Sequence, residues 1–279
     1  MKIYKTEEGI LLEHGNLFRI MKGDWDELVN RDNLFEFLEE QFLHLENFAG
    51  GDELLSKALL PPIGTQEVWA AGVTYFRSKE ARMDESKETG GASFYDKVYE
   101  AERPELFFKS NSHRVAGHRS TVNIRNDSTW NVPEPELTLY INSKGNIQGY
   151  TIGNDMSSRS IEGENPLYLP QAKTYERSAA LGPCLLVLPK PIEPFSVIQM
   201  EITRAGESLY KDSVAINKMK RTHTELASFL FRAMDFLEGV YLMTGTCLVP
   251  GHDFSLQPGD EVSISIQFIG TLINTVAVK

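Results

Sequence analysis

The sequence of 279 residues contains no run of about 18 apolar residues, so a membrane-spanning helix of ordinary length is not expected. The first 15 residues mix charged side chains with apolar ones and therefore lack the uninterrupted apolar segment of a secretory signal peptide. We expect a soluble, cytoplasmic protein that does not bind membranes.

Cysteine, basic charge and nucleotide-binding motifs are scarce as well. The two cysteines, Cys184 and Cys247, form no CxxC pair and have no histidine at metal-ligand spacing, which argues against a disulfide framework or a zinc site. The 28 basic residues are outnumbered by 39 acidic ones, and no basic stretch is segregated, so binding to nucleic acid is not expected. No GxGxxG or phosphate-binding loop is present to indicate a nucleotide.

What the sequence does contain is a series of short apolar segments separated by turn residues. Three such runs, Lys2–Tyr4, Ile10–Leu12 and Leu17–Ile20, precede a segment whose apolar spacings predict an amphipathic helix over Asp24–Phe48, with Asp24 as its N-cap. Two prolines and a glycine in Leu60–Gly64 then stop regular structure. We therefore predict a small N-terminal α/β domain over residues 1–61 and a larger domain over residues 62–279.

The larger region is predicted to form a mainly antiparallel β core. An apolar run over residues 68–73 indicates a strand, the charged segment 77–88 a helix, and Gly90-Gly91 a mobile tip. One further helix is expected over Thr222–Leu237, with Ala233 and Leu237 on its apolar face. The fold class expected is α+β, mainly β. The remaining expected strands are Val122–Ile124, Glu136–Asn142, Ile147–Ile152, Leu185–Leu188, Val197–Ile202, Glu261–Phe268 and Leu272–Val278.

The most informative motif lies in Val132–Asn142, where Glu134 and Glu136 alternate with prolines. Successive side chains of a strand point to opposite faces, so these two carboxylates project to the same side. Pro133 and Pro135 cannot donate hydrogen bonds to a neighbouring strand, which indicates a sheet edge or a frayed rim where a site can open.

A third carboxylate reaches this pair if the following segment returns as a hairpin. A two-residue turn at Lys144-Gly145 places Asp155 opposite Glu134, whereas a turn at Gly145-Asn146 places Asp155 opposite Glu136. In either register the side chain of Asp155 lies on the same face, with a Cβ to Cβ separation of about 5 Å from its partner.

Three carboxylates at such distances repel one another by roughly 1 to 4 kcal/mol per pair unless protons or a cation intervene. A bound cation relieves this repulsion, and ligation by oxygen alone favours Mg²⁺, Mn²⁺ or Ca²⁺ over zinc. The alternative, which the pattern alone leaves open, is that Glu134 and Glu136 form the solvated face of an ordinary edge strand.

Several motifs occur in the order typical of one enzyme family. They are Glu134-Pro135-Glu136-Leu137, the segment Gly149–Arg159, Lys173 followed by Leu181-Gly182-Pro183, Thr244-Gly245-Thr246 and Pro258-Gly259-Asp260. From near Val68 to the last residue, the chain resembles the fumarylacetoacetate hydrolase superfamily. The resemblance implies a mixed β-sandwich roll, a homodimer or higher homo-oligomer, and a bound divalent metal. The metal expected is Mg²⁺, with Mn²⁺ or Ca²⁺ as alternatives.

The resemblance also implies roles for particular residues. Glu134, Glu136 and Asp155 match the metal ligands of the family. Arg159 and Lys173 match residues that line its pocket, and Thr246 matches a residue that contacts the substrate carboxylate.

Within the superfamily, three further segments narrow the resemblance. Ser78–Arg82, Tyr99–Lys109 and Ile161–Lys173 are similar to those of 2-keto-3-deoxy-pentonate dehydratases, which form 2,5-dioxopentanoate by losing water. Hydrolytic members carry a histidine, paired with a glutamate, shortly after a glycine and tyrosine segment. Residues 72–80 contain no histidine, so this water-activating pair is absent from its usual place.

These observations lead to a hypothesis for the chemistry. Lys173 takes a proton from C3 of the substrate, provided that its amine is uncharged before reaction, and Glu105 protonates the leaving hydroxyl. Lys173 as a fixed cation, and Glu105 as a capping or surface residue, are the alternatives.

Four further roles are less determined by the sequence. Arg159 pairs with the metal carboxylates or the substrate, or plays a structural part. Thr246 approaches the substrate carboxylate or stabilises its own turn. Tyr75 and Phe76 are expected to contact the substrate at the start of a lid, or to belong to a flexible surface loop.

The function that we expect is a magnesium-dependent dehydratase acting on a small 2-keto acid. Two alternatives stay open at this point. The first is a hydrolase of carbon-carbon bonds in acylpyruvates or fumarylacetoacetate, and the second is a protein that binds keto acids without catalysis.

Overall fold

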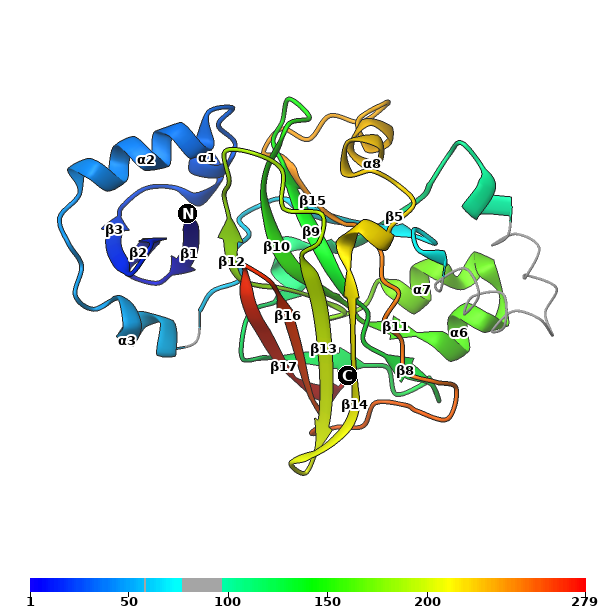
Figure 1. The fold of residues 1–279 in the computed structure, drawn as a ribbon. Helices are drawn as coiled ribbons and strands as arrows, with labels where there is room; N and C mark the ends of the chain where they lie inside the picture. Colours follow the sequence, from blue (N-terminus) through cyan, green and yellow to red (C-terminus); the bar gives the residue numbers. More distant parts are fainter. Residues whose placement is uncertain (58, 77–96) are drawn as a thin grey trace.

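The computed structural model describes residues 1–57, 59–76 and 97–279, and within them two large β-sheets pack face to face (Figure 1). The larger sheet runs in the order β3 (Leu17–Met21), β2 (Gly9–His14), β1 (Lys2–Thr6), β12 (Ala179–Leu186), β10 (Ile147–Asp155), β9 (Pro135–Ile141), β15 (Val240–Met243), β4 (Glu67–Gly72) and β5 (Glu105–Asn111), with β6 (Val115–Ala116) paired to β12. The smaller sheet runs in the order β14 (Glu207–Ala215), β13 (Val197–Arg204), β16 (Glu261–Ile266), β17 (Gly270–Val278) and β7 (Ser120–Ile124). β8 (Asn131–Val132) and β11 (Ser157–Ser158) form a separate pair.

The main hydrophobic core lies between these two sheets, where β12 packs on β17, β13 on β9 and β10 on β16. Alternate residues of β9, Leu137, Leu139 and Ile141, are fully buried in this core together with apolar residues of the smaller sheet. The alternation that turns these side chains inward sends Glu134 and Glu136 to the opposite face of the larger sheet. The mainly β sandwich expected from the sequence is confirmed.

The N-terminal region continues the larger sheet, because β1 pairs with β12. Its helices are α1 (Trp25–Val29), α2 (Leu34–His44) and α3 (Gly51–Ser56). The prediction of one helix over Asp24–Phe48 was therefore wrong, although Asp24 caps α1 by accepting a hydrogen bond from Glu27 N. The prediction of a domain boundary near residue 61 stays a prediction.

The break between α1 and α2 has a physical reason in the tip of the β9–β10 hairpin. The side chain of Asn30 accepts a hydrogen bond from Ser143 N at 2.7 Å, and that of Asp32 accepts one from Asn142 Nδ2 at 2.6 Å. These contacts hold the connection between the helices against the hairpin, where a continuous helix would carry the two side chains elsewhere.

Three further helices have bounds within the described residues. They are α6 (Arg159–Glu164), α7 (Leu169–Lys173) and α8 (His223–Leu230), with 3₁₀ turns η1 (Ser112–Arg114), η2 (Pro166–Tyr168) and η3 (Ile216–Lys218). The helix predicted over residues 77–88 and the tip at Gly90-Gly91 lie outside the described residues. Among the described residues, no helix has both the length and the apolar character that crossing a membrane requires.

Helix α8 is shorter than predicted. It begins after Thr222, whose side chain forms a capping box with Glu225, but it ends at Leu230 instead of Leu237. The chain then turns so that the rings of Phe231 and Phe236 pack at a centroid distance of 5.1 Å. Ala233 and Leu237, expected on the apolar face of the helix, are exposed.

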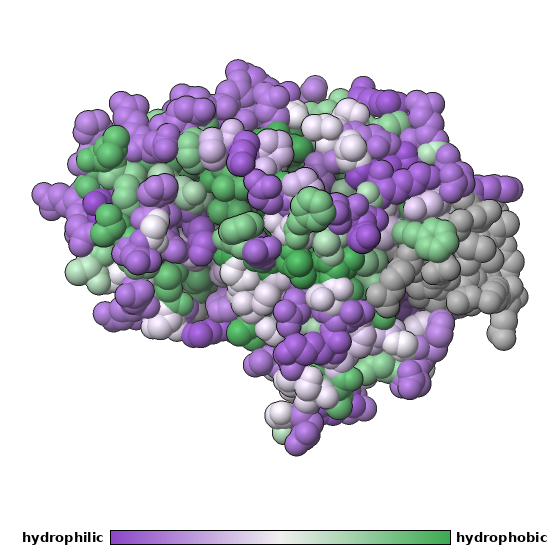
Figure 2. Space-filling view, viewed as in Figure 1, coloured by the Kyte–Doolittle hydropathy of each residue, from purple (hydrophilic) through white to green (hydrophobic). Residues whose placement is uncertain are grey.

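Some strands also differ from expectation. β12 begins at Ala179, six residues before the predicted Leu185, and β5, β14 and β15 were not predicted. In the space-filling view, hydrophobic residues gather toward the middle of one face while hydrophilic residues dominate its rim (Figure 2).

Candidate metal centre

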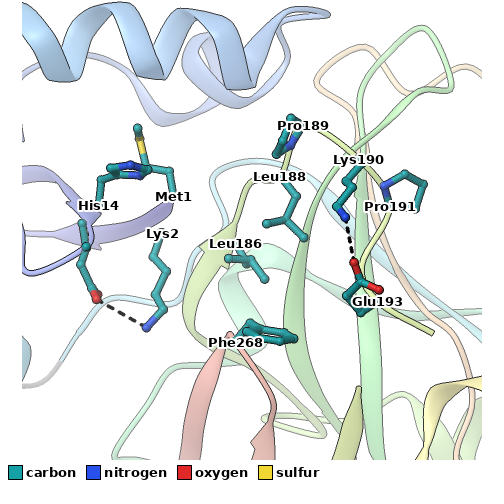
Figure 3. Close-up of a pocket in the computed structure, with 12 residues that line it drawn as sticks. Met1, Lys2, His14, Leu186, Leu188, Pro189, Lys190, Pro191, Glu193 and Phe268 are labelled. Atoms are coloured by element: carbon teal, nitrogen blue, oxygen red, sulfur yellow. Dashed lines mark hydrogen bonds and ion pairs between the residues drawn. The ribbon is translucent and has the colours of Figure 1, made fainter. Parts of the chain in front are cut away.

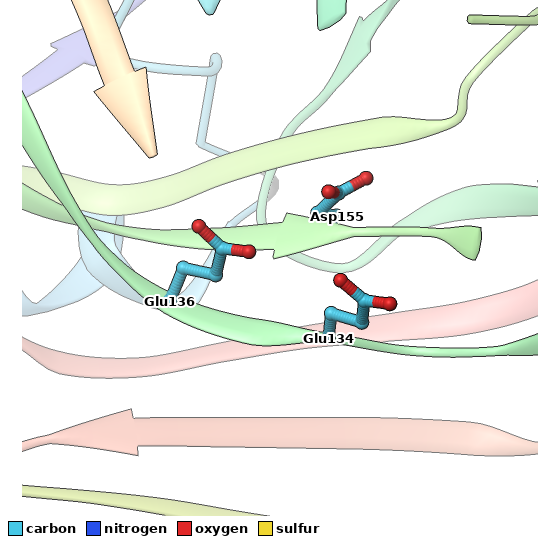
Figure 4. A group of neighbouring side chains, drawn as sticks. All are labelled: Glu134, Glu136 and Asp155. Carbon is cyan, nitrogen blue, oxygen red and sulfur yellow. The ribbon is translucent and has the colours of Figure 1, made fainter. Parts of the chain in front are cut away.

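Three carboxylates converge where β9 begins and its antiparallel neighbour β10 ends. Glu134 directly precedes β9, Glu136 lies within it, and Asp155 is the last residue of β10. One carboxylate oxygen from each residue lies within 4.8 Å of the other two, and all three side chains are buried (Figure 4). The structure thus brings together the three acids predicted as metal ligands and excludes the alternative of a solvated edge-strand face.

The turn of this hairpin differs from both predicted turns. Next to the turn, Asn142 N donates to Asn146 O at 2.9 Å, so the loop contains three residues, Ser143 to Gly145. Gly145 adopts a φ of +83°, the left-handed conformation that glycine tolerates best at this position of a three-residue loop. Continued regularly from this turn, the ladder would turn Asp155 to the face opposite Glu134.

A β-bulge restores the alignment of the acids. The pairing shifts by one residue between Ile147 and Gly149, and from Gly149 onward it follows the register of the predicted Lys144-Gly145 turn. At the site, Gly153 lies opposite Glu136, and Asp155 N donates to Glu134 O at 2.9 Å. The register that aligns Asp155 with Glu134 is confirmed, and the one that aligns Asp155 with Glu136 is wrong.

The site opens at a rim rather than at a true sheet edge. β9 has a neighbour on each side, but its pairing with β15 extends only from Ile141 to Thr138. Beyond that point Pro135 pairs with β10 alone. Of the two arrangements expected from the prolines, the structure shows the frayed rim.

Two of the predicted pocket residues hold these carboxylates directly. Arg159, the first residue of α6, donates from Nη2 to Glu134 Oε1 at 2.7 Å. Lys173, the last residue of α7, donates from Nζ to Glu134 Oε2 at 2.8 Å and to Asp155 Oδ2 at 3.0 Å. Both basic side chains are buried, so water screens their charges weakly and the pairs are strong.

A third buried cation, Lys109, was missed by the sequence analysis. Its Nζ forms an ion pair with Asp155 Oδ1 at 2.5 Å, and burial lowers its pKa to about 8, against the opposing effect of Asp155. The signal was a lysine that directly follows the apolar run Leu106–Phe108 of β5. Glu105 and Phe107 share one face of β5 by strand alternation, and Phe107 lines the same cavity as the three acids.

Electrostatics at Glu136 show that the cluster suits a cation. Burial raises the pKa of its carboxyl well above the usual range, and the negative charges of Asp155 and Glu134 add to this rise. Gly245 N opposes the rise by donating to Glu136 Oε2 at 2.5 Å. A divalent cation bound by these oxygen donors would relieve the repulsion, so the residues present fit Mg²⁺.

Glu105 lies at the border of this cavity. It pairs with Gly72 across β4 and β5, and Gly72 lines the cavity together with Glu134 and Glu136. The carboxylate of Glu105 rests against Gly72 so closely that a Cβ atom on residue 72 would stand 1.9 Å from Glu105 Oε2. The structure therefore places the predicted acid against a residue that lines the cavity of the three carboxylates.

Of the three other residues predicted to contact the substrate, Thr246 lies at the cavity, whereas Tyr75 and Phe76 do not line it. Thr246 lines the cavity, and its hydroxyl accepts a hydrogen bond from Leu248 N at 3.2 Å, so it also stabilises its own turn. Tyr75 is buried, whereas the side chain of Phe76 is 54% exposed and packs against Tyr99. The described residues that line the cavity do not include Tyr75 or Phe76.

A wider pocket lies elsewhere, between the N-terminal region and β12 (Figure 3). It is lined by apolar residues such as Leu188 and Phe268 and by charged residues that already have partners. Lys2 pairs with Glu13 at 3.6 Å, and Lys190 with Glu193 at 2.9 Å. This pocket contains none of the predicted site residues, so we place the chemistry at the three acids.

Comparison with known proteins agrees with this geometry. The sequence model described as fumarylacetoacetate (FAA) hydrolase C-terminal matches residues 68–277. The chain is 45% identical over 227 residues to a probable 2-keto-3-deoxyxylonate dehydratase of Haloferax volcanii, covering 81% of this chain and 77% of the relative. It is 41% identical over 234 residues to the 2-dehydro-3-deoxy-D-arabinonate dehydratase of Saccharolobus solfataricus, covering 83% and 77%.

Solved structures show the same similarity. A 2-keto-3-deoxy-D-arabinonate dehydratase complexed with magnesium and 2,5-dioxopentanoate superimposes with a TM-score of 0.86 at 33% identity, covering 100% of this chain and 99% of the other. With a family match over residues 68–277 and two relatives above 40% identity, this chain belongs to the fumarylacetoacetate hydrolase family.

Proposed function

We propose that this chain is a magnesium-dependent dehydratase that converts a 2-keto-3-deoxy-pentonate to 2,5-dioxopentanoate. The observation that carries the proposal is the buried group of Glu134, Glu136 and Asp155, in which Lys173 bridges Glu134 and Asp155. Two relatives above 40% identity bear the names of dehydratases for such substrates, and a similar structure holds magnesium and 2,5-dioxopentanoate.

Glu134, Glu136 and Asp155 would hold the metal. A bound Mg²⁺ supplies positive charge for the carboxylate and the 2-keto oxygen of the substrate, which stabilises the negative charge that develops when C3 loses a proton. The three acids are buried, so this charge acts with little screening by water.

In our proposal Lys173 is the base. Its Nζ accepts the proton from C3, and its contacts with Glu134 and Asp155 fix the amine beside the metal ligands. Glu105, against Gly72 at the border of the cavity, donates a proton to the C4 hydroxyl, which leaves as water. The C3–C4 double bond then shifts by proton transfer from C5 to C3, and the resulting enol becomes the C5 aldehyde of the product.

The remaining predicted residues have supporting roles in the proposal. Arg159 fixes Glu134 through its hydrogen bond at 2.7 Å. Thr246, at the wall of the cavity, is the proposed contact of the substrate carboxylate. Tyr75 and Phe76 stay proposed substrate contacts, and the rest of the segment expected to form a lid lies outside the described residues.

The assay that tests this function uses the purified protein with Mg²⁺ and each C4 epimer of 2-keto-3-deoxy-pentonate. We expect 2,5-dioxopentanoate from at least one epimer, and none after removal of the metal with EDTA. Release of pyruvate from acylpyruvates without any dioxopentanoate would establish the hydrolase alternative instead. Substrate binding without turnover of any candidate would establish the non-catalytic one.

The assembly and location of the protein belong to the same proposal. We propose a homodimer or higher homo-oligomer in the cytoplasm, because the family resemblance implies the assembly and the sequence favours the compartment. Light scattering coupled to gel filtration tests the assembly, and a monomer at all concentrations would contradict it.

A further inference from the structure

One peptide group beside the three acids, the one between Thr244 and Gly245, makes a buried hydrogen bond at each of its two ends. Its N–H, on Gly245, donates to Glu136 Oε2 at 2.5 Å. Its C=O, on Thr244, accepts from the hydroxyl of Thr74 at 2.7 Å. A trans peptide group is planar and its N–H and C=O point in opposite directions. A contact that fixes the carbonyl therefore also fixes the direction of the N–H.

This peptide group has few other restraints. Gly245 has a φ of +97°, in a region that glycine enters freely, so its backbone can adopt several orientations. On the other side, Thr244 N and the Thr244 hydroxyl both donate to Leu137 O, at 3.0 and 2.8 Å, which fixes the preceding peptide group. Within the described part of the chain, the hydroxyl of Thr74 is the only donor observed on the Thr244 carbonyl.

Thr74 is itself held firmly in place. Its side chain is buried, and its carbonyl accepts a hydrogen bond from Lys220 N at 2.9 Å. The preceding residue, Val73, lines the cavity and has a φ of +52°, where a β-branched side chain is strained. Such strain persists only where the surrounding structure enforces it, and it is frequent at functional sites. The strained turn at Val73 thus precedes the residue whose hydroxyl reaches Thr244.

We infer that Thr74 is a positioning residue of the metal centre. Its hydroxyl holds the Thr244–Gly245 peptide group in the orientation that directs the N–H to Glu136, and so keeps this carboxylate at the cavity. Without the hydroxyl, the buried carbonyl loses its donor and the glycine allows the peptide group to rotate. A carbonyl turned toward Glu136 would repel the carboxylate. The inference rests on the part of the proposed function that assigns the metal to the three acids.

The test is the Mg²⁺ dissociation constant of Thr74→Val, measured by titration calorimetry without substrate. Valine keeps the branched shape of threonine but has no hydroxyl. We expect the dissociation constant to rise by roughly 10- to 100-fold, the size typical of losing a group that orients a metal ligand. A value within twofold of the wild type overturns the inference.

Thr74→Ser separates the hydrogen bond from the packing of the threonine methyl group. Serine keeps the hydroxyl, so this variant should recover most of the affinity that valine loses. If serine weakens Mg²⁺ binding as much as valine does, the hydroxyl is not responsible and the inference is overturned. Should Thr74→Val not fold, Thr74→Ala removes the same hydroxyl without adding bulk and should show the same loss.

Thr6→Val is the matched control. The hydroxyl of Thr6 also donates to a backbone carbonyl at 2.7 Å, that of Gly9, but it lies at the end of β1 in the N-terminal region. The affinity for Mg²⁺ should not change in this variant. A loss as large as that in Thr74→Val would trace the effect to general destabilisation and overturn the inference.

The outcomes separate this inference from the proposed reaction. Weaker Mg²⁺ binding by Thr74→Val, in a protein that turns over no 2-keto-3-deoxy-pentonate, supports the inference and contradicts the dehydratase. Turnover by the wild type together with unchanged Mg²⁺ affinity in the variant does the reverse. A wild-type protein that binds no Mg²⁺ overturns both.

Discussion

Lys173 is a buried lysine whose Nζ contacts two acids that are also proposed metal ligands. Substitution of Lys173 by methionine keeps most of the side-chain volume but removes the proposed base. We expect turnover to fall by about 10²- to 10⁴-fold, the usual contribution of a positioned proton acceptor. Magnesium binding should persist, since removing a nearby positive charge does not weaken attraction for a cation. Measured turnover near the wild-type rate would exclude Lys173 as the base.

Gly72 offers a separate test of Glu105 that leaves its carboxyl group in place. A methyl group at residue 72 would stand 1.9 Å from Glu105 Oε2, so Gly72→Ala should push the carboxylate out of position. We expect kcat to fall by about tenfold or more, because small displacements of a catalytic group are costly, while magnesium affinity changes little. Steady-state kinetics and calorimetry measure the two quantities.

The control for Gly72→Ala is Gly251→Ala. Gly251 is exposed, and a methyl group there would stand 3.0 Å from the flexible side chain of Asp253. This variant should retain wild-type kinetics. Wild-type kcat in Gly72→Ala would count against Glu105 as the acid.

At the scale of elements, the β9–β10 hairpin shows both the reach and the limit of sequence reasoning. Strand alternation was enough to place Glu134, Glu136 and Asp155 on one face, but it left open whether Asp155 lies opposite Glu134 or Glu136. The loop length was wrong by one residue, and a bulge between Ile147 and Gly149 compensates for it. A bulge depends on long-range packing and leaves no fixed local pattern, so the alternation could not reveal it.

The helices and Lys109 show a related limit. Apolar spacing predicted a helix through residues 24–48, but hydrogen bonds of Asn30 and Asp32 to a distant hairpin divide it. Likewise, the role of Lys109, which follows the apolar run Leu106–Phe108, becomes clear only once Asp155 is known to face it. Partners far apart in the sequence decide both features, and local pattern contains no information about them.

His223 in helix α8 should make the stability of the folded protein depend on pH in the acid range. Burial lowers the pKa of His223, near the start of the helix, from 6.5 to about 4. The unfolded chain therefore binds a proton at a higher pH than the folded protein. As the pH falls from 6.5 toward about 4, the wild-type protein should lose stability relative to His223→Asn, and the difference should level off below that range. Calorimetric melting at several pH values measures this difference, and parallel curves would contradict it.

At the scale of the whole molecule, the fold class followed from the resemblance, but the order of strands did not follow from local pattern. The sequence indicated where strands occur and that most are antiparallel. It did not indicate that β1 lies beside β12, far along the chain, or that β15 pairs in parallel with β4. Such neighbours are set by how apolar faces cover one another in three dimensions.

The shared sheet has a consequence for how the protein unfolds. One hydrophobic cluster combines Leu38 of α2 and Ile3 of β1 with Val68, Leu181 and Tyr241 of the larger region. Because this cluster spans the predicted boundary near residue 61, we expect the two regions to unfold in a single calorimetric transition. Two independent domains would instead give two transitions.

Leu38→Ala tests this coupling through the N-terminal region alone. Leu38 is fully buried, so the substitution should lower the free energy of unfolding of the whole molecule by about 2 to 5 kcal/mol. Leu43→Ala on the same helix is the control, since Leu43 is 82% exposed and its removal should change stability by less than about 0.5 kcal/mol. If Leu38→Ala lowers an early transition and leaves a later, magnesium-sensitive one unchanged, the N-terminal region is an independent domain and the continuous sheet does not couple it to the metal centre.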